Sequence, residues 1–216
     1  MKTIDFFKQT AILIQARSGS SRLPNKIYFP YQGRPALLNL YQVCSSNNDC
    51  FVLGHNKDHN LISFCDNFKM SLRTFDGEND VIGRYYNFVK KHDYRYFLRV
   101  TADCFMISES TISIFLLRCC SAVQDGLIRG LYSNVFPIRC VDDGFDLELV
   151  DCEQFIKYYE DNLDFITISS ISREVKEHVL IDYQKLVEVF NDFAMKCTGE
   201  KYSVDTMEDY LRVINY

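Results

Sequence analysis

The sequence predicts an α/β protein built on a mostly parallel central sheet, and two observations support this prediction. Short apolar runs alternate with longer segments of helical periodicity over the first hundred residues, an order typical of βαβ units. The chain has 216 residues, of which 47% are hydrophobic and 25% charged. That composition is ordinary for a globular protein with a substantial core. We therefore expect a single domain over residues 1–216.

The individual elements follow from the same periodicities. Apolar runs predict strands over 11–15, 50–54, 71–75, 96–101, 130–133 and 145–150. Helical spacing predicts helices over 35–45, 57–68, 79–92, 109–123 and 152–160. Asp58 and the Asn79-Asp80 pair are good capping residues for two of these helices. In the third helix, Val81, Tyr85, Phe88 and Val89 fall on one face. The second half alternates less cleanly, so we expect some antiparallel strands there.

Charge and cysteine content exclude several classes of protein. The formal net charge is −5, whereas general nucleic-acid binders usually carry a basic balance or stripe. There are nine cysteines with no C-x-x-C spacing, which argues against a zinc ribbon or a thioredoxin-type site. No apolar stretch approaches the roughly 20 residues that span a bilayer, and the first residues lack the apolar core of a signal peptide. We expect a cytoplasmic protein with free, mostly buried thiols and neither nucleic-acid nor membrane partners.

A basic loop, residues 15–26, follows the first predicted strand. It contains Arg17, Arg22 and Lys26 together with Gly19 and several serines. Ligands of doubly wound sheets bind outside the carboxyl ends of the strands, and arginine forks and backbone amides suit phosphate oxygens. The loop matches neither the Walker A nor the dinucleotide fingerprint. Composition alone leaves two interpretations equally open, a phosphate cradle and a solvated charged surface loop.

Two aspartates also follow predicted strands or turns. Asp103 lies just past the 96–101 strand, and Asp205 lies in the turn 203–206. Bound phosphates normally come with Mg²⁺, which takes oxygen ligands and needs only one or two carboxylates. For Asp205 the residues alone favour a simpler role, as N-cap of a helix that starts at Thr206.

Other polar side chains have competing interpretations. Asp146 and Glu148 are two apart in the predicted strand 145–150, so they face the same side, as sugar-binding acids or as a polar outer face. His55 and His59 have the i, i+4 spacing of metal ligands, but surface or capping roles are favoured because no acidic third ligand is evident. Cys104 follows Asp103, and without a histidine partner we expect an inert thiol.

Six segments carry a recognisable pattern in order along the chain: residues 15–26, 75–85, 98–104, 144–148, 177–179 and 203–209. Together they resemble the nucleotide-activating cytidylyltransferases, which include CMP-KDO and CMP-sialic acid synthetases, and most closely the SpsF-like branch of spore-coat polysaccharide biosynthesis. Residues 15–26 resemble its Q-A-R-x-G-S-x-R-L-P-x-K loop. The others are residues 75–85 (G-x-x-x-D-V-L-x-R-Y), 98–104 (R-x-T-G-D-C-P), 144–148 (G-L-D-x-E), 177–179 (E-H-V) and 203–209 (V-D-T-P-E-D).

The resemblance implies a Rossmann-like, glycosyltransferase-A-type nucleotidyltransferase fold, with a nucleotide-binding half over about 1–105 and an acceptor-binding half over about 106–216. It implies transfer of CMP from CTP to a sugar or sugar acid in polysaccharide or glycoconjugate biosynthesis, with Mg²⁺. The implied catalytic residues are Arg17, Lys26 and Asp103, and the implied metal ligands are Asp103 and Asp205. The implied nucleotide contacts are Gln15, Ala16, Arg17, Gly19, Ser20, Arg22, Lys26, Arg84, Arg99 and Thr101. The implied acceptor contacts are Asp146, Glu148 and His178.

This sequence departs from the family pattern at Ala102, Phe105, Gly83, Lys176 and Met207. None of these changes removes a charged group that the chemistry requires. Two alternatives stay open: a UTP- or GTP-using nucleotidyltransferase or glycosyltransferase of the same fold, and a nucleotide-binding protein with little or no turnover. Arg84 is equally well explained by a structural salt bridge, and the oligomeric state stays open between monomer and homodimer.

Overall fold

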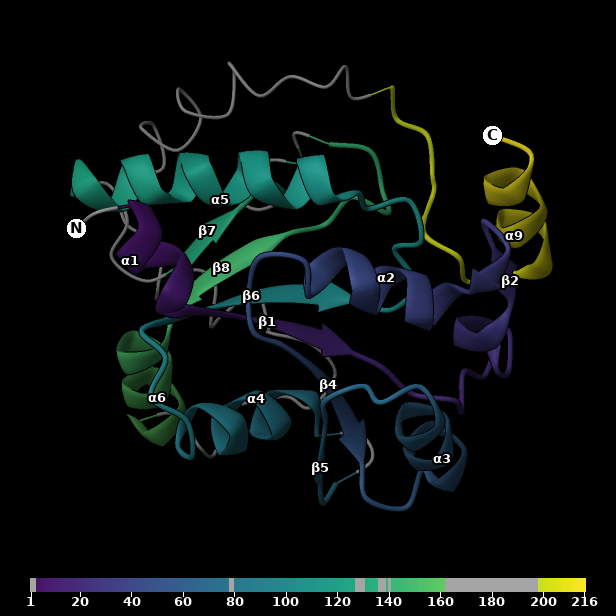
Figure 1. Cartoon of the computed structure of the whole chain (residues 1–216), viewed down its shortest axis with the longest axis horizontal. Helices are drawn as coiled ribbons and strands as arrows, with labels where there is room; N and C mark the ends of the chain where they lie inside the picture. The colour runs from purple at the N-terminus through teal and green to yellow at the C-terminus, as the bar shows by residue number, and fades with distance from the viewer. Residues whose placement is uncertain (1–2, 78–79, 127–130, 136–138, 140, 162–197) are drawn as a thin grey trace.

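A twisted central sheet forms the middle layer of the molecule (Figure 1). The computed structural model describes residues 3–77, 80–126, 131–135, 139, 141–161 and 198–216. Within these residues, six strands pair in the order β5-β4-β1-β6-β8-β7. Their bounds are β1 Thr10–Gln15, β4 Cys50–His55, β5 Leu72–Phe75, β6 Tyr96–Thr101, β7 Leu131–Ser133 and β8 Glu148–Asp151.

The strand order contains one reversal that positions the site. From β1 the chain moves outward to β4 and β5 and then returns to the other side of β1 as β6, and all four strands are parallel. The remaining strands follow as expected for the second half, with β8 antiparallel to both β6 and β7. The carboxyl ends of β1 and β6 are therefore the point where the winding reverses, which is where open α/β sheets bind ligands.

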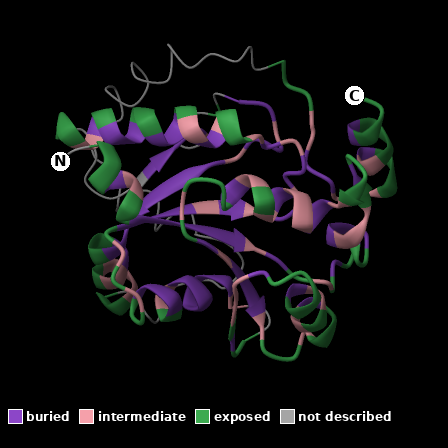
Figure 2. Ribbon diagram, in the orientation of Figure 1, coloured by how far each residue is buried: buried purple, intermediate pink, exposed green. Residues whose placement is uncertain are grey.

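Helices cover both faces of the sheet. The helices are α1 Thr3–Lys8, α2 Ala36–Cys44, α3 His59–Asn67, α4 Val81–Val89, α5 Glu109–Gln124, α6 Cys152–Asp161 and α9 Met207–Ile214. Ile12 and Ile14 of β1 pack into the cluster beneath α1, α2 and α5, whereas Ala11 and Leu13 pack against α4 and α6. This alternation is the period-2 pattern of a strand buried on both faces, and Figure 2 shows the strands as the buried middle layer.

A third, smaller cluster lies under the carboxyl edge of the sheet. It joins Leu23 and Tyr31 to Phe105, Val204 and Val213. Tyr31 belongs to a two-stranded hairpin, β2 Pro30–Tyr31 and β3 Arg34–Pro35, whose turn residues Gln32 and Gly33 have positive φ. The cluster thus packs the basic loop, the segment after β6 and the region around α9 against one another.

The predicted fold class and element order are confirmed, with local differences. Asp58 and Asp80 cap α3 and α4. The strand expected over 145–150 begins only at Glu148, so the expectation that Asp146 shares a strand with it is wrong. Helix α1, the short hairpin and the 3-10 turn η1 Lys26–Tyr28 were not predicted. The division into halves near residue 105 stays a prediction.

The structure also bears on the expectations about cysteines and membrane-spanning segments. The seven cysteines that the structure describes are free and buried. None of the described helices combines the length and apolar character that crossing a membrane requires.

Candidate active site

The basic loop and the segment that carries Asp103 leave the sheet side by side, from the ends of β1 and β6. Gln15 and Thr101 form the last register pair of β1 and β6, and the amide of Ala102 donates to the carbonyl of Gln15 at 3.0 Å. The basic loop starts immediately after Gln15, and Asp103 follows two residues after Thr101. The sheet topology therefore brings Asp103 next to the basic loop.

A second backbone bond brings in the distant Asp205. The amide of Val204 donates to the carbonyl of Asp103 at 3.0 Å, and Val204 is fully buried in the third cluster. The Lys26 ammonium then lies 3.0 Å from Oδ2 of Asp103 and 3.0 Å from Oδ1 of Asp205. Arg22 reaches the same Asp205 oxygen at 2.9 Å. We call Asp103 and Asp205 the carboxylate pair.

Lys26 points inward because of the turn that precedes it. Asn25 has φ 60°, in the left-handed region that asparagine tolerates better than most residues. The chain then enters η1, in which Lys26 and Ile27 are both buried. The loop therefore presents one cation to the interior, while Arg17 and Arg22 stay exposed.

Asp205 is not the cap of the following helix. Thr206 is the N-cap of α9, and its side chain forms a capping box with Asp209. Oδ2 of Asp209 accepts from the backbone amides of Asp205 and Thr206 and from the Lys201 ammonium. The alternative raised from the sequence is thus wrong, and the Asp205 carboxylate faces Lys26 and Arg22.

The capping box also fixes the charge state of the turn. Burial alone would raise the pKa of Asp209, but the bonds from Lys201, Thr206 and the backbone lower it to about 2. Burial likewise acts to raise the pKa of Asp205, and the bond and charge of Lys26, followed by Arg22 and Lys201, outweigh it and lower the pKa. Both carboxylates are therefore ionised at neutral pH.

The loop 142–144 packs against the segment that leads to Asp205. The Asp142 carboxylate accepts from the amides of Thr198 and Gly199 at 2.7 and 2.9 Å. Gly144 has φ +107°, and a Cβ there would lie 2.5 Å from the backbone of Tyr202. This glycine of the G-F-D-L-E segment is needed for close approach to the strand-like stretch that carries Asp205.

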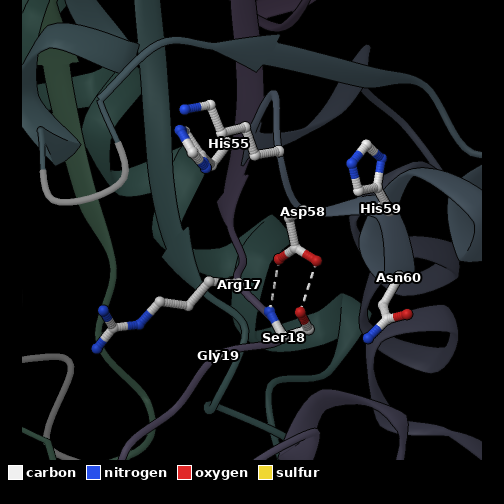
Figure 3. Close-up of a pocket in the computed structure, with 8 residues that line it drawn as sticks. Arg17, Ser18, Gly19, His55, Asp58, His59 and Asn60 are labelled. Atoms are coloured by element: carbon white, nitrogen blue, oxygen red, sulfur yellow. Dashed lines mark hydrogen bonds between the residues drawn. The ribbon is translucent and has the colours of Figure 1, made fainter.

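On its other side the basic loop borders a pocket of about 360 Å³. Its lining residues are Arg17, Ser18, Gly19, His55, Lys57, Asp58, His59 and Asn60. Figure 3 shows the Asp58 carboxylate bonded to both the amide and the hydroxyl of Ser18, at 2.8 and 2.5 Å. Because Asp58 also caps α3 through the amide of Leu61, one carboxylate ties the loop to that helix.

From the sequence we expected the backbone amides of the basic loop to be available to phosphate oxygens, but two of them are bonded to other groups of the protein. The amide of Ser18 donates to Asp58, and that of Ser20 donates to the carbonyl of Ser18. The amides of these two serines are thus already bonded within the protein, so the expectation that backbone amides of the loop serve phosphate oxygens is wrong at these two positions. Arg17 and Lys57 are the cationic side chains of the pocket lining, and His55 and His59, to which the sequence gave surface roles, contribute to its wall.

A polar network lies beneath the carboxyl ends of the strands. Arg99 donates to the fully buried Glu148 at 2.7 Å, across the β6–β8 register pair. Burial alone would lower the pKa of Arg99, but the charge of Glu148 outweighs it and raises the pKa. Oε1 of Gln15 accepts from Arg99 and from Tyr85, both at 3.5 Å. Glu148 thus acts from within the core, and its predicted acceptor contact stays a prediction.

The remaining predicted residues lie around these features. Arg84 is buried on α4; burial lowers its pKa, and Arg17 is close enough to lower it further. Thr101 contacts Cys104 at 3.1 Å, and burial followed by the charge of Asp103 raises the pKa of that thiol well above its usual value. Asp146 is paired with Arg139 at 2.8 Å.

Three further predicted residues complete the survey. Ala16 is buried where the loop leaves β1, and Ser20 is also buried. His178 lies outside the described residues, so its predicted role is not tested.

The carboxylate pair has the donor chemistry of a magnesium site. Both groups are carboxylates, the ligands this cation prefers, and bound phosphates would supply further oxygens. Their nearest oxygens share one ammonium as neighbour, so they lie no farther apart than twice its 3.0 Å distance. In the described part of the chain, no cluster of three or more His, Cys, Asp or Glu residues could hold a metal by itself. The residues therefore suit a cation that also binds a ligand.

Comparisons with known proteins agree on one kind of relative. A family model described as cytidylyltransferase matches residues 11–136, whereas a comparison with curated proteins gave no significant match. The chain is similar in structure to a cytidylyltransferase from Leptospira borgpetersenii, with TM-score 0.68, 23% identity, and coverage of 94% of this chain and 84% of that one.

Two other solved structures are similar over nearly their whole length. One is a CMP:2-keto-3-deoxy-manno-octonic acid synthetase complexed with CTP, with TM-score 0.62, 13% identity, and coverage of 95% and 97%. The other is a 4-diphosphocytidyl-2C-methyl-D-erythritol synthase from Anaerococcus prevotii, with TM-score 0.57, 16% identity, and coverage of 99% and 97%. At these identities the likeness shows the fold, and it confirms the expected α/β nucleotidyltransferase-like architecture.

Proposed function

The chain belongs to the cytidylyltransferase family and is a CTP-dependent nucleotidyltransferase, and we propose that its acceptor is a sugar or a sugar acid. The products would be a CMP-linked sugar and pyrophosphate, for polysaccharide or glycoconjugate synthesis. One observation above all supports this proposal. The buried Lys26 of the basic loop lies within hydrogen-bond distance of Asp103 and Asp205, at the point where the winding of the strands reverses direction.

The basic loop would bind the triphosphate. Arg17 and Arg22 are exposed residues of this loop. Their guanidinium groups can make forked bonds to phosphate oxygens. Lys26 adds a compact charge from within. These cations would stabilise the negative charge that develops on the departing pyrophosphate as the acceptor oxygen bonds to the α-phosphorus. Most of the rate enhancement would then come from positioning and charge stabilisation.

The pocket beside the loop has room for part of the nucleotide. It is bounded by Arg17, Ser18 and Gly19 on one side and by the start of α3 on the other. We assign Gln15, Ala16, Ser20, Arg84, Arg99 and Thr101 to the surrounding nucleotide contacts. Arg99 would act through Gln15, since its guanidinium is bonded to both Gln15 and Glu148.

Asp103 and Asp205 would hold Mg²⁺ together with phosphate oxygens. A bound magnesium ion would polarise the α-phosphate as a Lewis acid. The part played by the protein is to keep the two carboxylates side by side. The backbone bond from Val204 to Asp103 and the capping box of Asp209 do this.

The acceptor would approach from the side of Asp146. Asp146 lies close to the Asp103-Cys104 segment, because it contributes to the environment of the Cys104 thiol. Its carboxylate is paired with the half-exposed Arg139, so the pair offers both a hydrogen-bond acceptor and a donor to a sugar. Glu148 and His178 are the other proposed acceptor contacts.

The decisive experiment is a screen of sugar acids and sugar phosphates with CTP and Mg²⁺, read by release of pyrophosphate. Pyrophosphate that depends on both CTP and one acceptor class supports the proposal. CTP should also protect the protein thermally more than ATP, GTP or UTP, since a ligand at 100 times its dissociation constant stabilises by about 2.7 kcal/mol. A clear preference for UTP or GTP would contradict it. Binding without turnover for any acceptor would leave a nucleotide-binding role.

A further inference from the structure

The Lys26 ammonium lies where a cation shared by the carboxylate pair would lie. It is 3.0 Å from one oxygen of each aspartate, and its side chain is only 10% exposed. The aspartate side chains are 28% and 16% exposed, so water can reach the pair only in part. The described structure therefore contains a carboxylate pair whose negative charge is already partly neutralised by a lysine of the protein itself.

Two further cations reach Asp205. Arg22 lies 2.9 Å from Oδ1 and Lys201 lies 3.4 Å from Oδ2. Arg22 is 63% exposed, so its contribution is weakened by solvent. Lys201 is also bonded to Asp209 and contacts only one member of the pair. Lys26 is thus the described cation that joins both carboxylates.

A magnesium ion held by the carboxylate pair would compete with the Lys26 ammonium for carboxylate oxygens. Mg²⁺ requires ligands at about 2.0–2.1 Å in near-ideal octahedral geometry, and an ammonium bonded to the same two oxygens would repel it at short range. Binding of a free cation must therefore break both ion pairs and leave Lys26 buried without a counter-charge. That cost is large for a buried ion.

A triphosphate changes this balance because it offers Lys26 new oxygens. The lysine side chain has a flexible stem with three donors, and the loop that carries it also carries Arg17 and Arg22. Movement of the ammonium from the carboxylates to the phosphates would release the carboxylate oxygens at the same time as the phosphates supply more of them.

We propose that Lys26 is a built-in counter-ion that keeps divalent cations off the carboxylate pair until a nucleoside triphosphate binds. This inference rests on the proposed function, because it assumes that the pair holds the metal. It implies positive coupling: each of the cation and the triphosphate raises the affinity for the other.

The test measures binding of Mn²⁺, a paramagnetic substitute for Mg²⁺, by electron paramagnetic resonance with and without CTP and with no acceptor present. Wild-type protein should bind Mn²⁺ weakly alone and at least about tenfold more tightly with CTP. In Lys26→Met, Mn²⁺ affinity without CTP should rise by about tenfold or more, because the competing charge is gone. With CTP present, the same variant should bind Mn²⁺ less tightly than wild type, because a phosphate contact is lost.

Two lysine variants serve as matched controls. Lys201→Met removes a cation that touches one carboxylate, so it should raise Mn²⁺ affinity less than Lys26→Met. Lys90→Met removes a surface ion pair with Glu160, 3.0 Å long and half-exposed, and should leave Mn²⁺ affinity unchanged.

Several outcomes would overturn the inference. Equal Mn²⁺ affinity of the wild-type protein with and without CTP would do so, and this measurement does not depend on any variant folding. Unchanged or weaker Mn²⁺ binding in folded Lys26→Met without CTP would do so as well, while the cytidylyltransferase proposal would stand if CTP still bound. Absence of CTP binding to the wild type would overturn the proposed function and this inference with it.

Discussion

At the scale of the residue, the sequence allows Asp205 to be either a helix cap or a metal ligand, and the structure distinguishes between these roles. A carboxylate just before a helix is most simply explained as a cap. Here Thr206 and Asp209 cap α9 between them, and Asp205 faces Lys26 and Arg22 instead. Its side chain is therefore available for chemistry at little cost to the helix.

Substitution of Asp205 should accordingly affect activity and not stability. In Asp205→Asn the loss of charge beside the metal should cost about 3 kcal/mol, roughly a hundredfold in turnover, with a melting temperature near that of the wild type. Thr206→Ala should mainly lower stability, because loss of an N-cap costs about 1 kcal/mol, and it should reduce turnover far less than Asp205→Asn does. Pyrophosphate release and thermal denaturation of both variants check this. Near-normal turnover in Asp205→Asn at saturating Mg²⁺ and CTP would remove it from the metal site.

Single residues also mark the limit of sequence-based prediction. Lys26 and Asp103 could be placed near each other because both follow strands of a parallel sheet. Asp58 could be predicted as a helix cap but not as the anchor of Ser18, because nothing local signals a partner 40 residues away. Glu148 was expected to face the acceptor, and only the register with Arg99 shows that it is buried.

At the scale of the element, the loop 142–144 is a support for the turn that carries Asp205. It contributes three kinds of contact: the Asp142 carboxylate, backbone bonds between Asp143 and its neighbours at Glu200 and Tyr202, and the close approach at Gly144. These contacts are made largely to backbone groups of residues 198–203, so the support acts on the backbone.

A side chain at Gly144 should displace this support. Gly144→Ala combines a positive φ with a Cβ 2.5 Å from the Tyr202 backbone, and we expect about 5–10 °C off the melting temperature together with weaker Mn²⁺ binding in the presence of CTP. Gly126→Ala is the matched control, since φ there is +70° and nothing lies within 4 Å of the added Cβ. If the two substitutions lowered the melting temperature and the Mn²⁺ affinity equally, the positive φ alone would explain the effect, and the close contact with Tyr202 would play no part.

Most elements could be predicted from periodicity, and the exceptions have physical reasons. Helix α1 is only six residues long, too short for its apolar pattern to be distinguished from a loop. The β2–β3 hairpin has two-residue strands that contain Pro30 and Pro35, which are poor strand signals. The strand around Glu148 begins late because the Asn134 side chain bonds the carbonyl of Phe145 and the amide of Leu147.

At the scale of the whole molecule, the third cluster joins parts of the chain that the sequence keeps apart. Leu23 of the basic loop, Phe105 after β6 and Val204 before α9 pack together beneath the carboxylate pair. Tyr210 of α9 adds a bond to the carbonyl of Pro30 at 2.8 Å. The geometry of the site is thus a property of the tertiary fold, and the periodicity of any one element could not reveal it.

The two ion pairs of Lys26 span 77 and 179 residues of sequence, and this has a consequence for the lifetime of the folded chain. Contacts between such distant segments form late in folding, after the loop-closure entropy has been overcome. A ligand that binds Lys26 and both carboxylates replaces these ion pairs but still bridges the same distant segments. It therefore adds interactions that are mostly absent from the transition state, and such interactions act mainly on the unfolding rate. We expect CTP with Mg²⁺ to slow unfolding far more than it speeds folding, as pulse proteolysis in urea would measure. A cell that runs short of the nucleotide would then hold a shorter-lived enzyme, so that its supply of substrate would also set the rate at which the protein is lost.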